Sequence, residues 1–151
     1  MNNKRDKKDG DRMKSLLGKV GVILIGLMIL GYAEAWGADW ELYSSSEKVF
    51  YYYDAQNITR PSKNVVRVWE KWDYTEKGVM DMVGSFGKEY ENLSHTIFFL
   101  EINCSKKKNR GLSLTHYDHK GSVVYSISSP SEWRSINPES MAEKLYKKVC
   151  K

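Results

Sequence analysis

The chain has 151 residues, with 24 basic and 19 acidic side chains and a formal net charge of +5. Residues 1–35 contribute seven of the basic and four of the acidic side chains, so the rest of the chain has 17 basic and 15 acidic residues, a net of +2. A nucleic-acid-binding domain needs a clustered basic footprint, and this nearly neutral balance argues against nucleic acid as a partner.

The first 35 residues have the order of a secretory signal peptide. A basic stretch leads into an apolar run from Val20 to Leu30, and small residues follow at Ala33 and Ala35. A membrane-spanning helix needs about 20 apolar residues, so this shorter run indicates a cleaved signal, with a retained N-terminal anchor as the alternative. Met13 is a second candidate for the true start, because MKSLLGK alone makes an ordinary basic region.

Cleavage is expected after Ala35, with Gly37 and Ala38 as alternatives. It would leave residues 36–151 as a single domain of ordinary size. No cysteine lies near the cleavage site, so no lipid-attachment signal is present. We therefore expect an exported protein of the periplasm or the cell exterior, with no integral membrane segment after cleavage.

Cys104 and Cys150 are the only cysteines in the sequence. An oxidising compartment and an even cysteine count predict a disulfide bond between them. This bond would close a loop of about 46 residues and contribute roughly 4 kcal/mol by a chain-entropy estimate. A catalytic thiol is the alternative, but no Cys-x-x-Cys or Cys-His signature is present.

Alternating, β-rich segments dominate the chain after the signal. DWELYSS and KVFYYYD are the first two strand candidates, NITRPSKN has turn chemistry, and NVVRVWEKWDYT is the longest strand candidate. Glu70 falls on an otherwise apolar face of this strand. A β-bulge that re-aims Glu70 is expected, with a functional buried carboxylate as the alternative. The apolar residues of that face are Val66, Val68, Trp72 and Tyr74.

Residues 76–94 contain three glycines and no clean hydrophobic period. We interpret this segment as a long loop with at most a short helical turn. Loops beyond about 12–15 residues are uncommon unless they are functional or disordered. The segment is therefore either a binding surface or an inert insertion.

A second group of strands follows the loop. In HTIFFLEINC the period of two places Cys104 on an apolar face with Phe98, Leu100 and Ile102. RGLSLTHYDH and GSVVYSIS form a predicted hairpin around DHKG. Cys104 therefore faces whatever element covers the sheet.

The C-terminal segment predicts an amphipathic helix. Asn137 is the expected N-cap, Pro138 suits the first helical position, and Glu139 suits the positive end of the helix. The predicted fold is α+β, an antiparallel sheet of about six strands with the C-terminal helix packed on one face and tied by the disulfide. The apolar stripe of the helix consists of Met141, Ala142, Leu145 and Val149.

No catalytic set or cofactor motif is visible in the sequence. The best metal candidate is THYDH, with His116, Asp118 and His119, but His119 should point away from the other two on a strand. We interpret these residues as polar turn residues. No glycine-rich phosphate loop, nucleophile elbow or haem-attachment motif is present.

Two surfaces are candidates for binding a partner. A cluster of cations could contact acidic glycans or lipid headgroups, although a solvated hairpin turn is the simpler interpretation. This cluster consists of Lys106, Lys107, Lys108 and Arg110. Several aromatic residues are expected on the sheet face opposite the helix, where they would suggest a partner or dimer surface. They are Phe50, Tyr52, Trp69 and Phe99. Coverage of these residues by the loop of residues 76–94 is the alternative.

The ordered elements resemble the surface-adhesin protein E-like domain family of Gram-negative bacteria. The resemblance runs from about Trp40 to Cys150, through an ITR turn, VVRVWEKWDY, a strand ending in cysteine, YDHKGSVVYS, EWRSINPES and a helix ending in VC. It implies the same sheet, helix and Cys104–Cys150 bridge. It also implies framework roles for Trp69, Tyr74, Trp133 and Pro138.

The best-known members of that family bind host extracellular-matrix proteins and can form dimers. The founding adhesin is a lipoprotein, whereas this chain has no lipid-acceptor cysteine. The sequence therefore predicts an exported, non-enzymatic module that binds an extracellular protein or an acidic polymer and can form a homodimer. A periplasmic accessory protein of the cell envelope is the alternative, and an enzyme ranks third.

Overall fold

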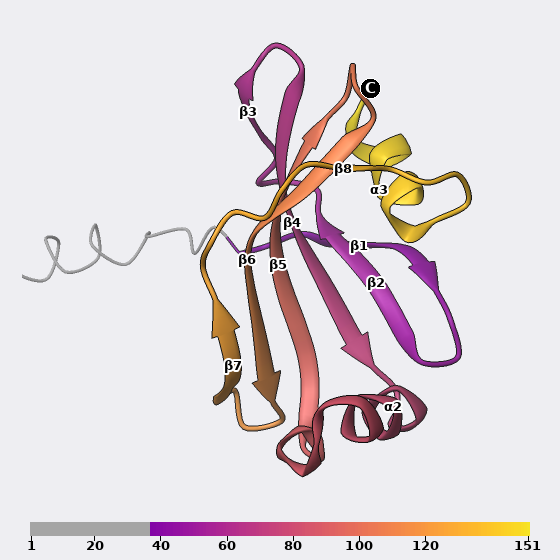
Figure 1. The fold of residues 1–151 in the computed structure, drawn as a ribbon, viewed down its shortest axis with the longest axis vertical. Helices are drawn as coiled ribbons and strands as arrows, with labels where there is room; N and C mark the ends of the chain where they lie inside the picture. Colours follow the sequence, from indigo (N-terminus) through magenta and orange to yellow (C-terminus); the bar gives the residue numbers. More distant parts are fainter. Residues whose placement is uncertain (1–36) are drawn as a thin grey trace, which may run out of the picture. The chain divides into compact units, whose positions relative to one another are not determined.

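A computed structural model describes residues 37–151 as an antiparallel sheet with two α-helices (Figure 1). The strands are β1 (Trp40–Ser45), β2 (Val49–Asp54), β3 (Thr59–Ser62), β4 (Val65–Tyr74), β5 (Leu93–Asn103), β6 (Lys108–Asp118), β7 (Val123–Ile127) and β8 (Arg134–Ser135). The helices are α2 (Glu76–Phe86) and α3 (Met141–Val149), and η1 (Lys88–Tyr90) is a single 3-10 turn. The predicted signal peptide lies outside the described residues.

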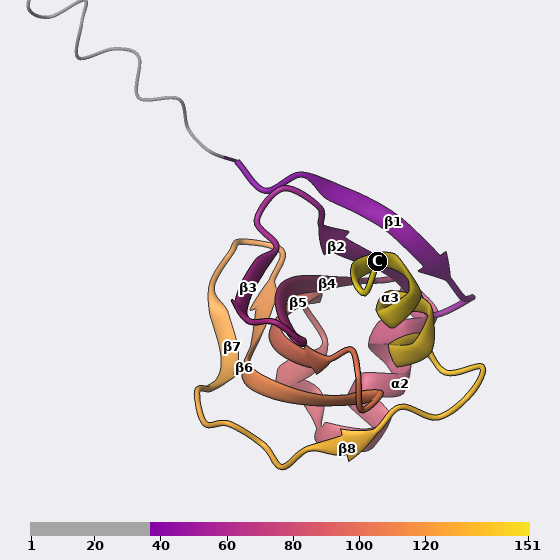
Figure 2. The ribbon, with the colours of Figure 1, turned by 90° about the horizontal axis from the view of Figure 1, so that it is seen from above.

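Six strands form the main path of the sheet, in the order β1-β2-β4-β5-β6-β7. The short strands β3 and β8 pair with β4 and β6. The predicted α+β class, with about six strands and a C-terminal helix, is confirmed. Figure 2 shows that the sheet is curved and that α3 lies on its concave side. No helix within residues 37–151 has the length and apolar character needed to cross a membrane.

Alternating residues of each strand point to opposite sides of the sheet. Val66 and Val68 are fully buried on the side that carries α3, which we call the inner face. Cross-strand pairing places Ile102 opposite Val66 and Leu100 opposite Val68 on the same face. The predicted apolar faces of both long strands are therefore confirmed. The outer face is the opposite side, to which Trp69 belongs.

The hydrophobic core lies between the inner face and α3. Leu145 and Val149 of the helix are buried against Val66, Val68 and Ile102. The predicted disulfide joins Cys104 to Cys150, with Cα atoms 5.5 Å apart. The bond therefore connects the end of α3 to the strand on which the helix packs.

Residues 76–94 form ordered secondary structure, so their interpretation as a loop is wrong. Thr75 caps the N-terminus of α2, because its hydroxyl accepts a hydrogen bond from the amide of Gly78 at 3.2 Å. A Cβ atom at Gly78 would overlap the carbonyl oxygen of Lys48, so glycine permits this helix to approach the β1–β2 turn. Gly87 ends the helix with a φ of 116°.

The N-terminus of α3 also differs from the prediction. Ser140, rather than Asn137, is the N-cap, and its hydroxyl accepts a hydrogen bond from the amide of Glu143 at 3.2 Å. Glu139 has a φ of 64° and therefore lies outside the helix. The helix begins three residues later than expected because the chain turns at Glu139 before entering it.

The predicted bulge at Glu70 is absent. The register between β4 and β5 is continuous from Val65 to Asp73, so Glu70 remains on the inner face and is buried. The segment containing Pro61 also differs from the prediction, because Thr59–Ser62 forms the short strand β3 instead of an irregular turn. Proline is tolerated there because β3 lies at the margin of the sheet.

Candidate functional site

Three lysines of the predicted basic patch surround the turn between β5 and β6. Lys106 and Lys107 are exposed, and Asn103 Oδ1 accepts a hydrogen bond from the amide of Lys106 at 3.0 Å. The amine of Lys107 lies 5.8 Å from the ring of Tyr146 on α3. Lys108 is half-buried at the start of β6. The lysine turn, Lys106–Lys108, therefore presents its charge to solvent at one end of the sheet.

Arg110, the fourth cation of the patch, has a different role. Its Nε donates a hydrogen bond to Glu101 Oε2 at 2.7 Å, and Arg67 Nε donates to Glu101 Oε1 at 2.8 Å. Glu101 is only 3% exposed. The guanidinium of Arg110 also lies 4.7 Å from the ring of Trp133. Arg110 therefore neutralises a buried carboxylate and is not a freely available cation.

The ion network around Glu101 also sets the charge of that residue. Burial acts to raise the pKa of Glu101, but hydrogen bonds and charges from Arg110 and Arg67 outweigh it and lower the pKa. Glu101 is consequently ionised at neutral pH. Two arginines and one carboxylate leave a net charge of +1 on this part of the outer face.

Exposed apolar side chains lie on the outer face beside this network. Trp69 is 36% exposed, Phe50 41% and Leu42 52%. Trp69 stacks on Phe99 of the neighbouring strand, with ring centroids 4.3 Å apart. Leu42 pairs across the strands with Tyr52, which extends the apolar area to the edge strand β1. The aromatic platform is defined as Leu42, Phe50, Tyr52, Trp69 and Phe99.

Lys71 lies within the aromatic platform. It pairs with Tyr52 across the β2–β4 ladder, and its amine lies 4.7 Å from the centroid of the Tyr52 ring. Its amine also lies 3.0 Å from a carboxylate oxygen of Asp73. A cation held among aromatic rings gives the platform both apolar and charged contact groups. The platform can therefore contact a partner that combines apolar and acidic groups.

The inner face contains one buried carboxyl group, Glu70. The hydroxyl of Tyr43 donates a hydrogen bond to Glu70 Oε1. Burial raises the pKa of Glu70 against the opposing effect of this hydrogen bond. The neighbouring Tyr53 donates to Glu41 at 2.6 Å instead, and this hydrogen bond with burial raises the pKa of Tyr53 to about 12. Trp72 also lowers the pKa of Glu70, but burial outweighs both donors.

The residues of the THYDH segment do not converge. His116 is buried, and its Nδ1 lies 2.6 Å from the hydroxyl oxygen of Thr96. Asp118 instead accepts hydrogen bonds from the amides of Lys120 and Ser122 in the hairpin turn. Residues 37–151 contain no group of three or more side chains placed to hold a metal ion.

The framework residues implied by the resemblance have separate environments. Tyr74 shares a 3.0 Å hydrogen bond with Thr96, and Trp133 covers Arg110. Trp69 is instead partly exposed on the platform. Leu42 and the Glu101 network were not predicted from the sequence. The alternation in VVRVWEKWDY does place Arg67, Trp69 and Lys71 on one face, but their cross-strand neighbours depend on the register.

Comparison with known proteins yielded one family. A family model described as surface-adhesin protein E matches residues 40–151, which include every strand and helix described above. Neither a curated protein nor a solved structure matches the chain.

Proposed function

The chain belongs to the surface-adhesin protein E family, and we propose that it is an exported, non-enzymatic module that binds an extracellular protein through the aromatic platform. The family describes adhesins, which supports a role in binding at the cell surface. The signal-like order of residues 1–35 supports export. The outer face is chosen as the binding surface on one observation, the cluster of exposed aromatic and aliphatic side chains there.

The aromatic platform leaves apolar side chains exposed to solvent. A sheet with one helix-covered face is expected to be polar on the other face. Here Phe50, Trp69 and Leu42 are at least one-third exposed on that face. Aromatic side chains contribute large contact areas in interfaces and are enriched among the residues that dominate binding energy. Burial of these side chains by a partner would therefore be favourable.

The charges around the platform favour an acidic partner surface. The Arg67–Glu101–Arg110 network has a net charge of +1, and the lysine turn lies at the end of the same sheet. The charge of Lys71 within the platform is balanced by Asp73. Complementary charge at the rim of an interface mainly accelerates association and is weakened by salt. An acidic polymer alone would use the lysine turn and would not need the aromatic side chains.

Binding assays with exposed-residue variants test this proposal. A panel of purified extracellular-matrix proteins first identifies one that binds. Phe50→Ser and Trp69→Ser should each weaken binding to that protein by at least about tenfold. Met80→Ser is the matched control, because Met80 is 67% exposed on α2 and not on the platform. Thermal unfolding of each variant verifies that the fold is retained.

The outcomes separate the two candidate surfaces. If replacement of Lys106–Lys108 by glutamine abolishes binding while Phe50→Ser and Trp69→Ser have no effect, the lysine turn is the binding site and the platform proposal is wrong. If the control Met80→Ser weakens binding as strongly as the platform variants, the surface assignment is also wrong.

A further inference from the structure

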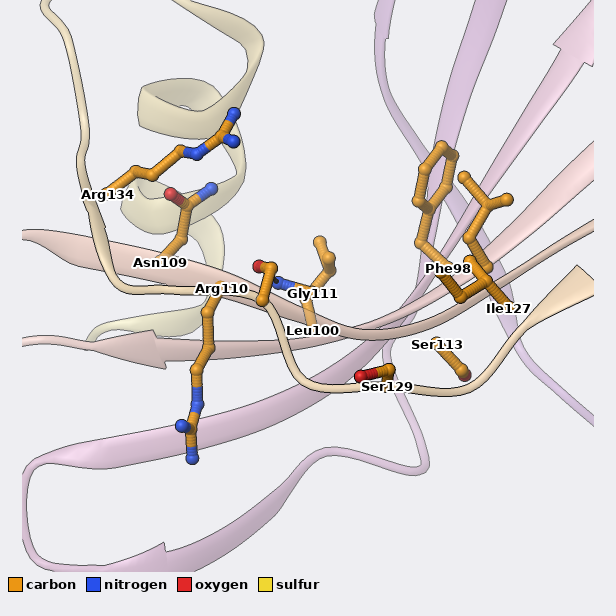
Figure 3. Close-up of a pocket in the computed structure, with 11 residues that line it drawn as sticks. Phe98, Leu100, Asn109, Arg110, Gly111, Ser113, Ile127, Ser129 and Arg134 are labelled. Carbon is orange, nitrogen blue, oxygen red and sulfur yellow. Dashed lines mark hydrogen bonds between the residues drawn. The ribbon is translucent and has the colours of Figure 1, made fainter.

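A cavity of about 430 Å³ opens on the inner face, between β6 and the segment that follows β7 (Figure 3). Strand β7 pairs with residues 114–117 of β6, and strand β8 pairs with Lys108 and Asn109 of β6. Between these contacts, Ser131 forms hydrogen bonds with Gly111 at 2.8 and 3.0 Å, and the ring of Trp133 packs on Arg110 of β6. Pro130 lacks an amide donor and cannot extend the ladder there.

One end of the cavity is apolar. Its floor comes from neighbouring strands, because Phe98 pairs with Leu114 and Leu114 pairs with Ile127. Leu100 continues this floor toward the core. Ile127 is 46% exposed, so the apolar end is open to solvent.

The opposite end of the cavity is polar and positively charged. Asn109 and Arg134 lie side by side on paired strands, and Figure 3 shows both side chains at the end away from Phe98 and Ile127. Within residues 37–151, no carboxylate forms an ion pair with Arg134. Arg110 also borders the cavity, but it is bound to Glu101 and points in the opposite direction from Arg134. Among residues 37–151, none of the side chains that line the cavity is acidic.

We propose that this cavity binds an aliphatic carboxylate, with the carboxylate group at Arg134 and Asn109 and the alkyl chain along Leu100, Phe98 and Leu114. A guanidinium group and an amide are suitable donors to a carboxylate. From Asn109 to Leu114 the strand rises by roughly 17 Å at about 3.4 Å per residue, so the site is elongated. Its volume lies in the range of about 300–1,000 Å³ typical of small-molecule sites. The site is separate from the aromatic platform, which lies on the other face.

Gly111 lines the cavity at a position where an added Cβ atom has room. A Cβ atom there would meet only Ser131 Oγ, at 3.8 Å, so a larger side chain can extend into the open space. Gly111→Leu should therefore block the middle of the site. Arg134→Gln should remove the charge that attracts the carboxylate, and Lys120→Gln is the control because Lys120 is exposed in the β6–β7 turn.

Isothermal titration of the exported protein with dodecanoate tests the proposal. We expect saturable binding of one dodecanoate per chain, at least about tenfold weaker binding of dodecanol, and unchanged binding by Lys120→Gln. Gly111→Leu should lose binding, and Arg134→Gln should weaken it by about tenfold or more. Circular dichroism and thermal unfolding verify the fold of each variant.

Four results would overturn the proposal. They are no saturable binding, equal affinity for dodecanoate and dodecanol, full affinity in a folded Gly111→Leu variant, and full affinity in Arg134→Gln. If the protein sediments as a dimer, does not bind dodecanoate, and becomes a monomer in the Gly111→Leu variant, the cavity is instead a contact with a second copy. Sedimentation velocity with and without dodecanoate makes this distinction.

Discussion

Tyr43 of β1 donates a hydrogen bond to Glu70 of β4, two strands away, and the carboxyl group that accepts it is buried. Burial raises the pKa of Glu70 above its ordinary value of 4.5. The folded protein therefore binds this proton more tightly than the unfolded chain does. Between the raised pKa and pH 4.5, the contribution of Glu70 should therefore increase the free energy of unfolding as the pH falls.

The glutamine variant isolates this contribution. Glu70→Gln retains an acceptor for Tyr43 but does not titrate. The stability difference, wild type minus Glu70→Gln, should increase as the pH falls from 7 toward 4.5, with a slope of at most about 1.4 kcal/mol per pH unit. Urea unfolding of both proteins across this range measures it. A difference that does not change with pH would show that Glu70 has the same pKa in the folded and unfolded chain.

Glu101 should show the opposite dependence on pH. Its pKa is lowered by Arg110 and Arg67 despite its burial. The stabilisation from Glu101 is therefore fully present above pH 4.5 and is lost as the pH falls through the lowered folded-state pKa. Glu101→Gln should unfold with a weaker pH dependence than the wild type in this acidic range, as measured by urea unfolding.

Removal of the Glu101 side chain should also be costly at neutral pH. Glu101→Ala leaves the two arginines close together without their anion, and should lower the free energy of unfolding by roughly 3 kcal/mol. This is the lower end of the range for breaking a buried ion pair, because Arg67 and Arg110 are partly exposed. Asp81→Asn breaks the exposed pair with Lys48 and should cost less than about 1 kcal/mol. Equal effects of the two changes would contradict the structural role of Glu101.

Two glycines of α2 should respond in opposite directions to the same substitution. Gly78→Ala places a methyl group against the carbonyl oxygen of Lys48 and should destabilise the protein by about 1–3 kcal/mol. Gly84→Ala has no atom within 4 Å of the new Cβ and should stabilise the helix by up to about 1 kcal/mol. Thermal unfolding distinguishes the two effects. A stabilising Gly78→Ala would show that α2 does not pack on the β1–β2 turn.

The disulfide should account for a large part of the stability. It closes a separation of 46 residues, and its removal should lower the free energy of unfolding by roughly 4 kcal/mol. The double variant Cys104→Ser/Cys150→Ser should melt more than about 10 °C below the oxidised wild type. The reduced wild type should match the double variant. An unchanged melting temperature would show that the bridge contributes no net stability.

The sequence predicted the features that depend on local period and chemistry. The period of two gave the inner faces of β4 and β5, and the even cysteine count gave the Cys104–Cys150 bond. Helix α2 was missed because its two glycines, with Gly87 directly after it, lower the helix propensity of the segment, and Gly78 is required by a close approach to Lys48, which is distant in sequence. Thr75 at its N-cap was the one local signal available.

The candidate surfaces depended on the sheet register, which the sequence did not provide. Arg67, Glu101 and Arg110 become neighbours only because β4, β5 and β6 pair in a particular register. Arg110 therefore looked like a free member of the basic cluster. The four aromatic residues of the platform were predicted on the face opposite α3 because alternation alone places them there.

Protease shaving of intact cells is the most direct measurement of whether this protein acts at the cell surface. We expect protease added outside intact cells to remove the protein while a periplasmic marker remains protected. Matrix-protein binding can then be compared between shaved and untreated whole cells. A protein that is protected in intact cells and recovered in the periplasmic extract would contradict the proposed surface role, and would favour an accessory function within the envelope.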